Sequence, residues 1–106
     1  FATLPGISKV GSYTGNGSSQ TIDCGFSAGA RFVLIKRTSG TADWLVFDTA
    51  RGINASANDP RLRLNSTDAE DNNFDQIDPD SSGFIIKGSG LNTNGSGENY
   101  IFLAIA

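Results

Sequence analysis

Short apolar runs separated by turn-forming residues dominate the hydrophobic pattern of this 106-residue chain. The most prominent pair lies within Arg31–Gly52, where the runs Phe32–Ile35 and Trp44–Phe47 flank the turn-forming segment Thr38–Asp43. Runs of four apolar residues, rich in β-branched and aromatic types and bounded by Gly, Ser and Asp, are typical of strands buried on both faces. We therefore expect a hairpin here, at the centre of the core.

Five further strand candidates bring the expected total to seven. They are the segments Ser8–Thr14, Gln20–Cys24, Arg61–Asn65, Gly83–Lys87 and Tyr100–Ala106. In Arg61–Asn65, strict alternation predicts that the two leucines face the core and that the two arginines face solvent. The closing run is apolar throughout, which predicts a central strand with both faces covered.

These patterns predict an all-β fold, an antiparallel β-sandwich that is jelly-roll-like and has about seven strands. Helices are not expected, because each apolar run is too short and is flanked by turn residues. Residues 1–7 contain a Pro-Gly turn and are expected to form a lead-in segment or linker, with residues 8–106 as the single domain. A chain of this length can form one core without disulfides or metals.

Two connections carry specific expectations. Residues 66–82 form the longest polar tract, and its apolar residues Phe74 and Ile77 are expected to pin it to the body of the domain. The second expected strand of the central hairpin ends in the pattern Asp-x-x-Arg-Gly. There, Asp48 is expected to accept backbone N–H groups across the turn, while Arg51 pairs with its carboxylate.

The charge of the chain disfavours nucleic acid as a partner, because a net charge of −3 and a pI of about 4.6 provide no phosphate-tracking surface. The charge is uneven. Residues 31–63 hold six basic and three acidic side chains, whereas residues 64–106 hold Lys87 against seven acidic ones. The two halves either pair, within one chain or between subunits, or form two solvated surfaces, which is the simpler interpretation. No apolar run approaches the roughly 20 residues that cross a bilayer, so membrane insertion is not expected.

Catalytic chemistry finds little support in the residue types. The chain has no histidine, so the usual hydroxyl and thiol triads are not available. Paired carboxylates hydrolyse glycosides, but no spacing in this sequence selects a pair. The single cysteine, Cys24, alternates with Ile22 and has no neighbouring base, which favours a buried structural thiol. We therefore expect no enzyme activity and no catalytic residues.

Calcium is the one cofactor for which the sequence offers candidate ligands. In Asp78-Pro79-Asp80-Ser81-Ser82-Gly83, oxygen ligands and a glycine follow each other as at the start of a calcium-binding loop. The position of the bidentate glutamate is taken by Ser89, and the intervening residues have strand character. Asp78, Asp80 and Ser82 are therefore weak candidates, and a solvated acidic loop without metal or cofactor is the favoured interpretation.

Surface recognition is the remaining kind of chemistry. Trp44 and Tyr13 can stack on sugar rings, and the Asn- and Asp-rich loops can hydrogen-bond sugar hydroxyl groups. The alternative is that Trp44 begins a buried strand and packs in the core, as large aromatic side chains commonly do, and we favour that alternative.

Five segments together carry a resemblance to a known family. They are VGSYTGNGSSQTIDCGFSAGARFVLIKRT, DWLVFDTARG, LRLNST, DSSGF and the terminal YIFLAIA. From about Lys9 to Ala106, the chain resembles a β-rich domain of tailed-bacteriophage virion proteins. That domain often lies at or near the C-terminus of long tail or fibre proteins. The resemblance brings no catalytic motif and no site residue.

This resemblance implies a structural protein on the exterior of the virion. The first expectation is a tail-fibre or tail module that contacts the host surface. Its partners would be other virion proteins, copies of itself and a host surface glycan. The alternatives are a capsid decoration or head-fibre protein, and a carbohydrate-binding or carbohydrate-active module. Virion symmetry implies that the domain acts as an oligomer or in repeated copies.

Overall fold

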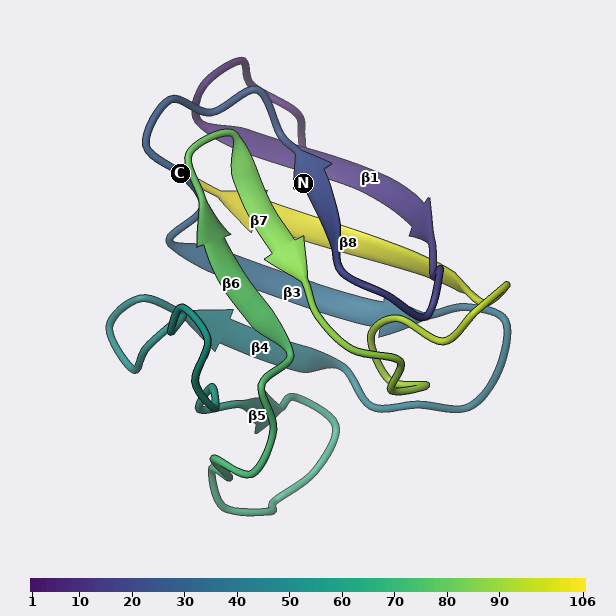
Figure 1. Cartoon of the computed structure of the whole chain (residues 1–106). Coiled ribbons are helices and arrows are strands. Elements are labelled where there is room, and N and C mark those ends of the chain that lie inside the picture. Colours follow the sequence, from purple (N-terminus) through teal and green to yellow (C-terminus); the bar gives the residue numbers. More distant parts are fainter.

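The computed structural model describes residues 1–106 and contains eight strands arranged in two antiparallel sheets (Figure 1). The strands are β1 (Ser8–Thr14), β2 (Gln20–Asp23), β3 (Phe32–Arg37), β4 (Leu45–Asp48), β5 (Leu62–Arg63), β6 (Ile77–Asp80), β7 (Gly83–Ile86) and β8 (Asn99–Ile105). One sheet has the order β1-β8-β3-β4-β5, and the other has the order β2-β7-β6. The predicted all-β sandwich is confirmed, with one strand more than the sequence suggested.

The three-stranded sheet covers one face of the five-stranded sheet (Figure 1), and the core fills the space between them. The first strand pairs with the last, and β2 pairs with β7. This nesting is jelly-roll-like. Phe84 of β7 meets Phe102 of β8 edge-on, with ring centroids 5.4 Å apart, which joins the two sheets. None of the elements is a helix of the length and apolarity needed to cross a bilayer.

The central hairpin forms as predicted, because β3 and β4 pair in register from Phe32 opposite Asp48 to Ile35 opposite Leu45. The closing strand β8 is central, as expected, since it lies between β1 and β3. The prediction that these strands are buried on both faces is wrong. The second sheet covers only one face, so Ile101 on the other face of β8 remains 40% exposed.

The orientation predicted for Arg61–Asn65 is also wrong. Arg61 is 5% exposed, whereas Leu62 and Leu64 face outward. The alternation is real but has the opposite phase, because Arg63 pairs opposite the buried Leu45 and thereby takes the inner side of the sheet. The inward-facing guanidinium groups of Arg61 and Arg63 bind side chains of the following loop. Both arginines bind Asp71, and Arg61 also binds Gln76.

The two predicted loop contacts had different outcomes. Ile77 is fully buried at the start of β6, but Phe74 is about half exposed and does not anchor the loop. The buried carboxylate of Asp59 performs that task instead, because it accepts the backbone N–H groups of Asn54, Gln76 and Ile77 at 2.7–3.1 Å.

The turn after β4 is confirmed. Asp48 Oδ1 accepts the backbone N–H of Arg51 at 2.8 Å, and Asp48 Oδ2 accepts the Arg51 Nε–H at 2.8 Å. Arg51 also donates to the carbonyl of Val46 at 3.0 Å, which fixes the exit of the chain from the sheet.

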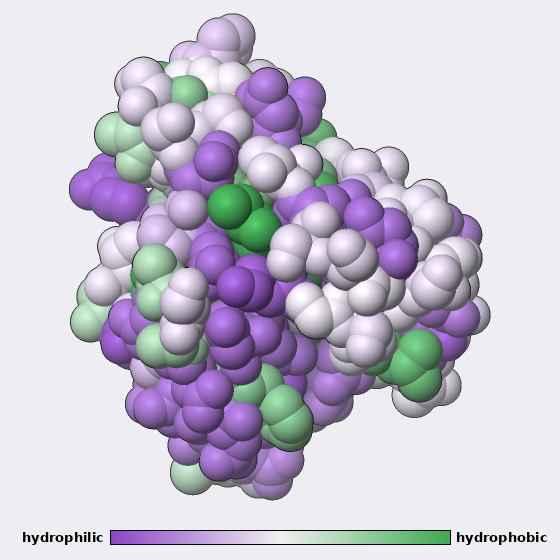
Figure 2. All heavy atoms as spheres, viewed as in Figure 1, coloured by the Kyte–Doolittle hydropathy of each residue, from purple (hydrophilic) through white to green (hydrophobic).

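The unequal charges of the two sequence halves pair within the chain rather than forming two separate surfaces. Arg37 binds Glu98 at 2.8 Å, and Arg61 binds Asp71 at 3.0 Å. Figure 2 shows hydrophilic residues gathered over the lower part of the molecule, around β4, β5 and their loops. Hydrophobic atoms form only small, separate groups on this side of the molecule.

Candidate functional site

The two aromatic candidates for ligand binding, Tyr13 and Trp44, lie on opposite faces of the five-stranded sheet and do not form one site. Tyr13 lies on the inner face, where its ring stacks on Tyr100 with centroids 5.0 Å apart. Its hydroxyl group donates to the carbonyl of Thr93 at 2.6 Å, and burial raises its pKa strongly. Tyr13 is half-buried and packs against the core.

Trp44 departs from the favoured interpretation that it packs in the core. It directly precedes β4, on the outer face of the sheet, and is 38% exposed. Its backbone N–H donates to Asn65 Oδ1 at 3.0 Å, which fixes the position of the residue. Trp44 is thus available for contact with a partner.

The weak calcium candidates are engaged with protein groups. Asp78 accepts the Lys87 Nζ group at 3.1 Å and the backbone N–H of Ser56 at 3.2 Å. Asp80 accepts both the backbone N–H and the hydroxyl of Ser82, at 3.0 and 2.5 Å, within the β6–β7 turn. No group of three or more Asp, Glu, His or Cys side chains has a geometry suited to a metal ion.

Cys24 lies just beyond β2 and is 6% exposed. Burial raises the pKa of its thiol to about 11. Strand β7 approaches closely at Gly83. A Cβ atom at this position would collide with the carbonyl oxygen of Ile22 and would lie 2.9 Å from the Cys24 sulfur. The thiol therefore fills a place in the packing between β2 and β7.

The uncovered face of the five-stranded sheet forms a first candidate site. The strand register aligns an apolar row across all five strands, composed of Val10, Leu103, Leu34, Val46 and Leu62. Further apolar side chains flank this row, and together they make up what we call the outer apolar face: Phe32, Trp44, Leu64, Ile101 and Ile105. A groove of about 390 Å³ crosses it, with Val10, Leu34, Trp44 and Ile101 in its walls.

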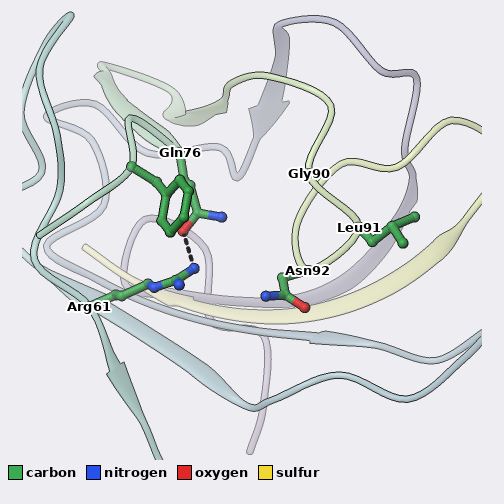
Figure 3. Close-up of a pocket in the computed structure, with 6 residues that line it drawn as sticks. Arg61, Gln76, Gly90, Leu91 and Asn92 are labelled. Carbon is green, nitrogen blue, oxygen red and sulfur yellow. Dashed lines mark hydrogen bonds between the residues drawn. The ribbon is translucent and has the colours of Figure 1, made fainter. Parts of the chain in front are cut away.

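A second candidate site, the Arg61 cleft, is a cavity of about 290 Å³ lined by Arg61, Phe74, Gln76, Gly90, Leu91 and Asn92 (Figure 3). The segment around β5 and the loop before β6 provide one wall, and the loop between β7 and β8 provides the other. Figure 3 shows the Asn92 side chain directed toward Arg61 across the cleft, whereas Leu91 points away from it.

Arg61 is held rigidly in this cleft. Its Nε–H donates to both carboxylate oxygens of Asp71, at 3.0 and 3.2 Å, and its Nη1 donates to Gln76 Oε1 at 2.8 Å. The Phe74 ring lies against the guanidinium group, with its centroid 4.8 Å from Cζ. Arg63 Nη1 also reaches Asp71, at 2.9 Å. Burial alone would raise the pKa of Asp71, but the hydrogen bonds and charges of the two arginines outweigh it and lower that pKa.

Sequence reasoning missed the Arg61 cleft. Its residues come from three segments that are separate in the sequence, and neither Gln76 nor Asn92 belongs to a recognisable motif. The sequence contained one signal for it. Arg61 and Arg63 alternate with leucines, and an acidic tract begins at Asp68, so inward-facing arginines would find acidic partners nearby in the chain.

The whole chain, residues 1–106, matches the family model described as "Domain of unknown function (DUF7483)". No curated protein and no solved structure matches the chain.

Proposed function

We propose that the chain, which belongs to the DUF7483 family, is a non-enzymatic structural module of a tailed-phage virion. In this proposal it is part of a tail fibre or tail protein, is displayed on the outside of the particle and contacts the host surface. The resemblance of its strand and turn motifs to virion domains supports this assignment, as does a surface suited to contact with other proteins.

The outer apolar face is the observation that carries the proposal. Its six most exposed side chains, Val10, Trp44, Leu62, Leu64, Ile101 and Ile105, are each 36–64% exposed. They gather on one face of one sheet, and a group of exposed apolar side chains of this kind is often functional. A face of this kind marks contact with another protein.

A second copy of the chain is the occupant that fits this face. The apolar row runs across all five strands of the sheet, so the face is broad enough to pair with the same face of another chain. The polar rim of this face consists of Ser12, Thr14, Lys36, Asp48 and Asn99. An apolar centre with a polar border is the usual anatomy of a protein interface. Virion proteins occur in symmetric copies, so such a partner would be present at high local concentration.

Gold-labelled antibody against the domain, applied to intact particles and viewed by electron microscopy, tests this function. Gold at the tail or fibre ends is the expected result. Gold spread over the head would contradict the tail assignment and indicate a capsid decoration protein. Particles that remain unlabelled, although their dissociated proteins react with the antibody on a blot, would contradict display on the exterior. A lack of reaction in both assays would contradict the virion assignment.

A further inference from the structure

We infer that the Arg61 cleft is a binding site for a neutral hexopyranose unit of a surface glycan. This inference rests on the proposed contact with the host surface and names the chemistry of that contact. It places sugar recognition in the cleft and not at Trp44 or Tyr13, the aromatic residues that the sequence suggested.

The first argument is the set of polar groups that face the cleft without a protein partner. Arg61 uses Nε and Nη1 in hydrogen bonds within the protein, but its Nη2 has no such bond. Gln76 accepts through Oε1, and its Nε2 makes no hydrogen bond to the protein. The side chain of Asn92 makes no hydrogen bond to the protein and supplies both a donor and an acceptor. Sugar hydroxyl groups accept and donate, so they can pair with all three side chains.

The second argument is the apolar ring beside these groups. Phe74 is 51% exposed and lines the cleft, with only part of its surface against Arg61. Arg61 lies over one face of this ring, and the other face, which is also negative, can attract the slightly positive C–H groups of a sugar ring. A small site with a ring and a few convergent polar groups has the general character of a ligand pocket. By contrast, Trp44 stands among apolar side chains, which suit a protein partner better than a sugar.

The third argument is rigidity. Asp71 and Gln76 hold the Arg61 side chain, and Asp59 holds the backbone of Gln76 at 3.0 Å. On the opposite wall, the Tyr100 hydroxyl donates to the carbonyl of Leu91 at 2.6 Å, directly before Asn92. The walls are therefore organised before a ligand arrives, which lowers the entropic cost of binding.

The fourth argument concerns charge and selects a neutral ligand. Arg61 and Arg63 are balanced by Asp71 and Asp43, which lies 3.0 Å from the Arg63 Nε. The network carries two positive and two negative charges, so it offers no net positive field to hold an anionic sugar or a phosphate. The free N–H groups act through hydrogen bonds and not through an excess of charge.

The test is a titration of the ¹⁵N-labelled 106-residue chain with methyl glycosides of glucose, galactose, mannose and N-acetylglucosamine, followed by ¹H–¹⁵N NMR. We expect at least one glycoside to shift the side-chain signals of Gln76 Nε2 and Asn92 Nδ2 in a saturable manner. Asn92→Ala is expected to weaken binding at least about five-fold, through the lost hydrogen bonds. Phe74→Ala is expected to weaken it by a similar or larger factor. Asn73→Ala, a neighbouring exposed asparagine outside the cleft, is the matched control and should leave binding unchanged.

Three results would overturn the inference. The first is that none of the four glycosides shifts the Gln76 and Asn92 signals. The second is that binding persists in both cleft variants but disappears in Trp44→Ala, which would move the site to the outer apolar face. The third is that methyl glucuronoside or inorganic sulfate shifts these signals at lower concentration than every neutral glycoside, which would make the site an anion site. The antibody experiment on particles is independent of these results, so failure of sugar binding and failure of the virion assignment can be told apart.

Discussion

Arg61 and Asp71 form a two-oxygen contact beneath the edge of the five-stranded sheet, with the arginine Nε 3.0 and 3.2 Å from the two carboxylate oxygens. The side chain of Arg61 is 6% exposed and that of Asp71 is 18% exposed, so water screens this pair weakly. Removing one partner from such a pair leaves an uncompensated charge, which costs more than the pair itself contributes. This contact therefore anchors the polar loop as well as one wall of the cleft.

Asp71→Asn is expected to lower the free energy of unfolding by roughly 2–3 kcal/mol, because Arg61 and Arg63 lose their shared anionic partner. Urea denaturation followed by circular dichroism measures this difference. Asp68→Asn is the matched control, since Asp68 is exposed and forms no ion pair, and it should change the stability by less than about 0.5 kcal/mol. Equal effects of the two substitutions would show that the Asp71 pair contributes nothing specific.

The stability difference between the wild-type chain and Asp71→Asn is expected to depend on pH. The folded-state pKa of Asp71 is lowered, so its stabilising contribution is present above the ordinary aspartate pKa and is lost as the pH falls through the folded value. The difference in melting temperature between the wild-type chain and Asp71→Asn should therefore shrink below about pH 4. Burial raises the pKa of Asp59, which acts in the opposite direction but equally in both proteins. A constant difference from pH 7 to pH 3 would contradict this assignment.

Two phenylalanines test which face of the sheet is the core. Phe102 is 5% exposed between the sheets, so Phe102→Ala is expected to cost about 3–5 kcal/mol of stability through the cavity it leaves. Phe32 lies on the outer apolar face and is partly exposed, so Phe32→Ala is expected to cost less than about 2 kcal/mol. Urea denaturation of both variants measures the ranking, and the reverse order would contradict the described placement of the core.

Asn94 links two loops from within the protein. Its Nδ2 donates to the carbonyls of Ser18 and Gly88 at 2.7 and 2.8 Å, and its Oδ1 accepts Gln20 Nε2 at 2.8 Å. The residue is fully buried, so Asn94→Ala leaves several polar groups without partners. We expect a loss of about 2–4 kcal/mol in thermal or urea unfolding. Asn73→Ala is the control, and a loss for Asn94→Ala no larger than for that variant would refute this role.

Ile101 lies on the outer apolar face, where a second copy is proposed to pack. Ile101→Lys should weaken self-association by at least about ten-fold, because burying an unpaired ammonium group in an apolar interface is costly. Sedimentation equilibrium measures this change. Leu91→Lys places the same charge on an exposed residue away from that face and should leave association unchanged. A wild-type chain that stays monomeric at millimolar concentration would contradict the proposed self-contact.

The amino-acid sequence by itself determined the features that depend on neighbours in the chain. The apolar runs at Phe32–Ile35 and Trp44–Phe47 and their turn chemistry specified the central hairpin, and Asp48 with Arg51 specified the turn that follows it. These features rest on side-chain alternation and turn preferences, which act over a few residues.

Only the tertiary structure decided which side of each strand is covered. Alternation shows that Arg61 and Leu62 face opposite ways, but the pairing of β5 with β4 and the position of Asp71 determine that the arginine is the buried one. In the same way, Tyr13 packs against the core and Trp44 is exposed because the second sheet covers one face of the first. The Arg61 cleft likewise needs residues from separate segments to converge. A local pattern cannot encode such choices, because they depend on contacts between residues that are distant in the chain.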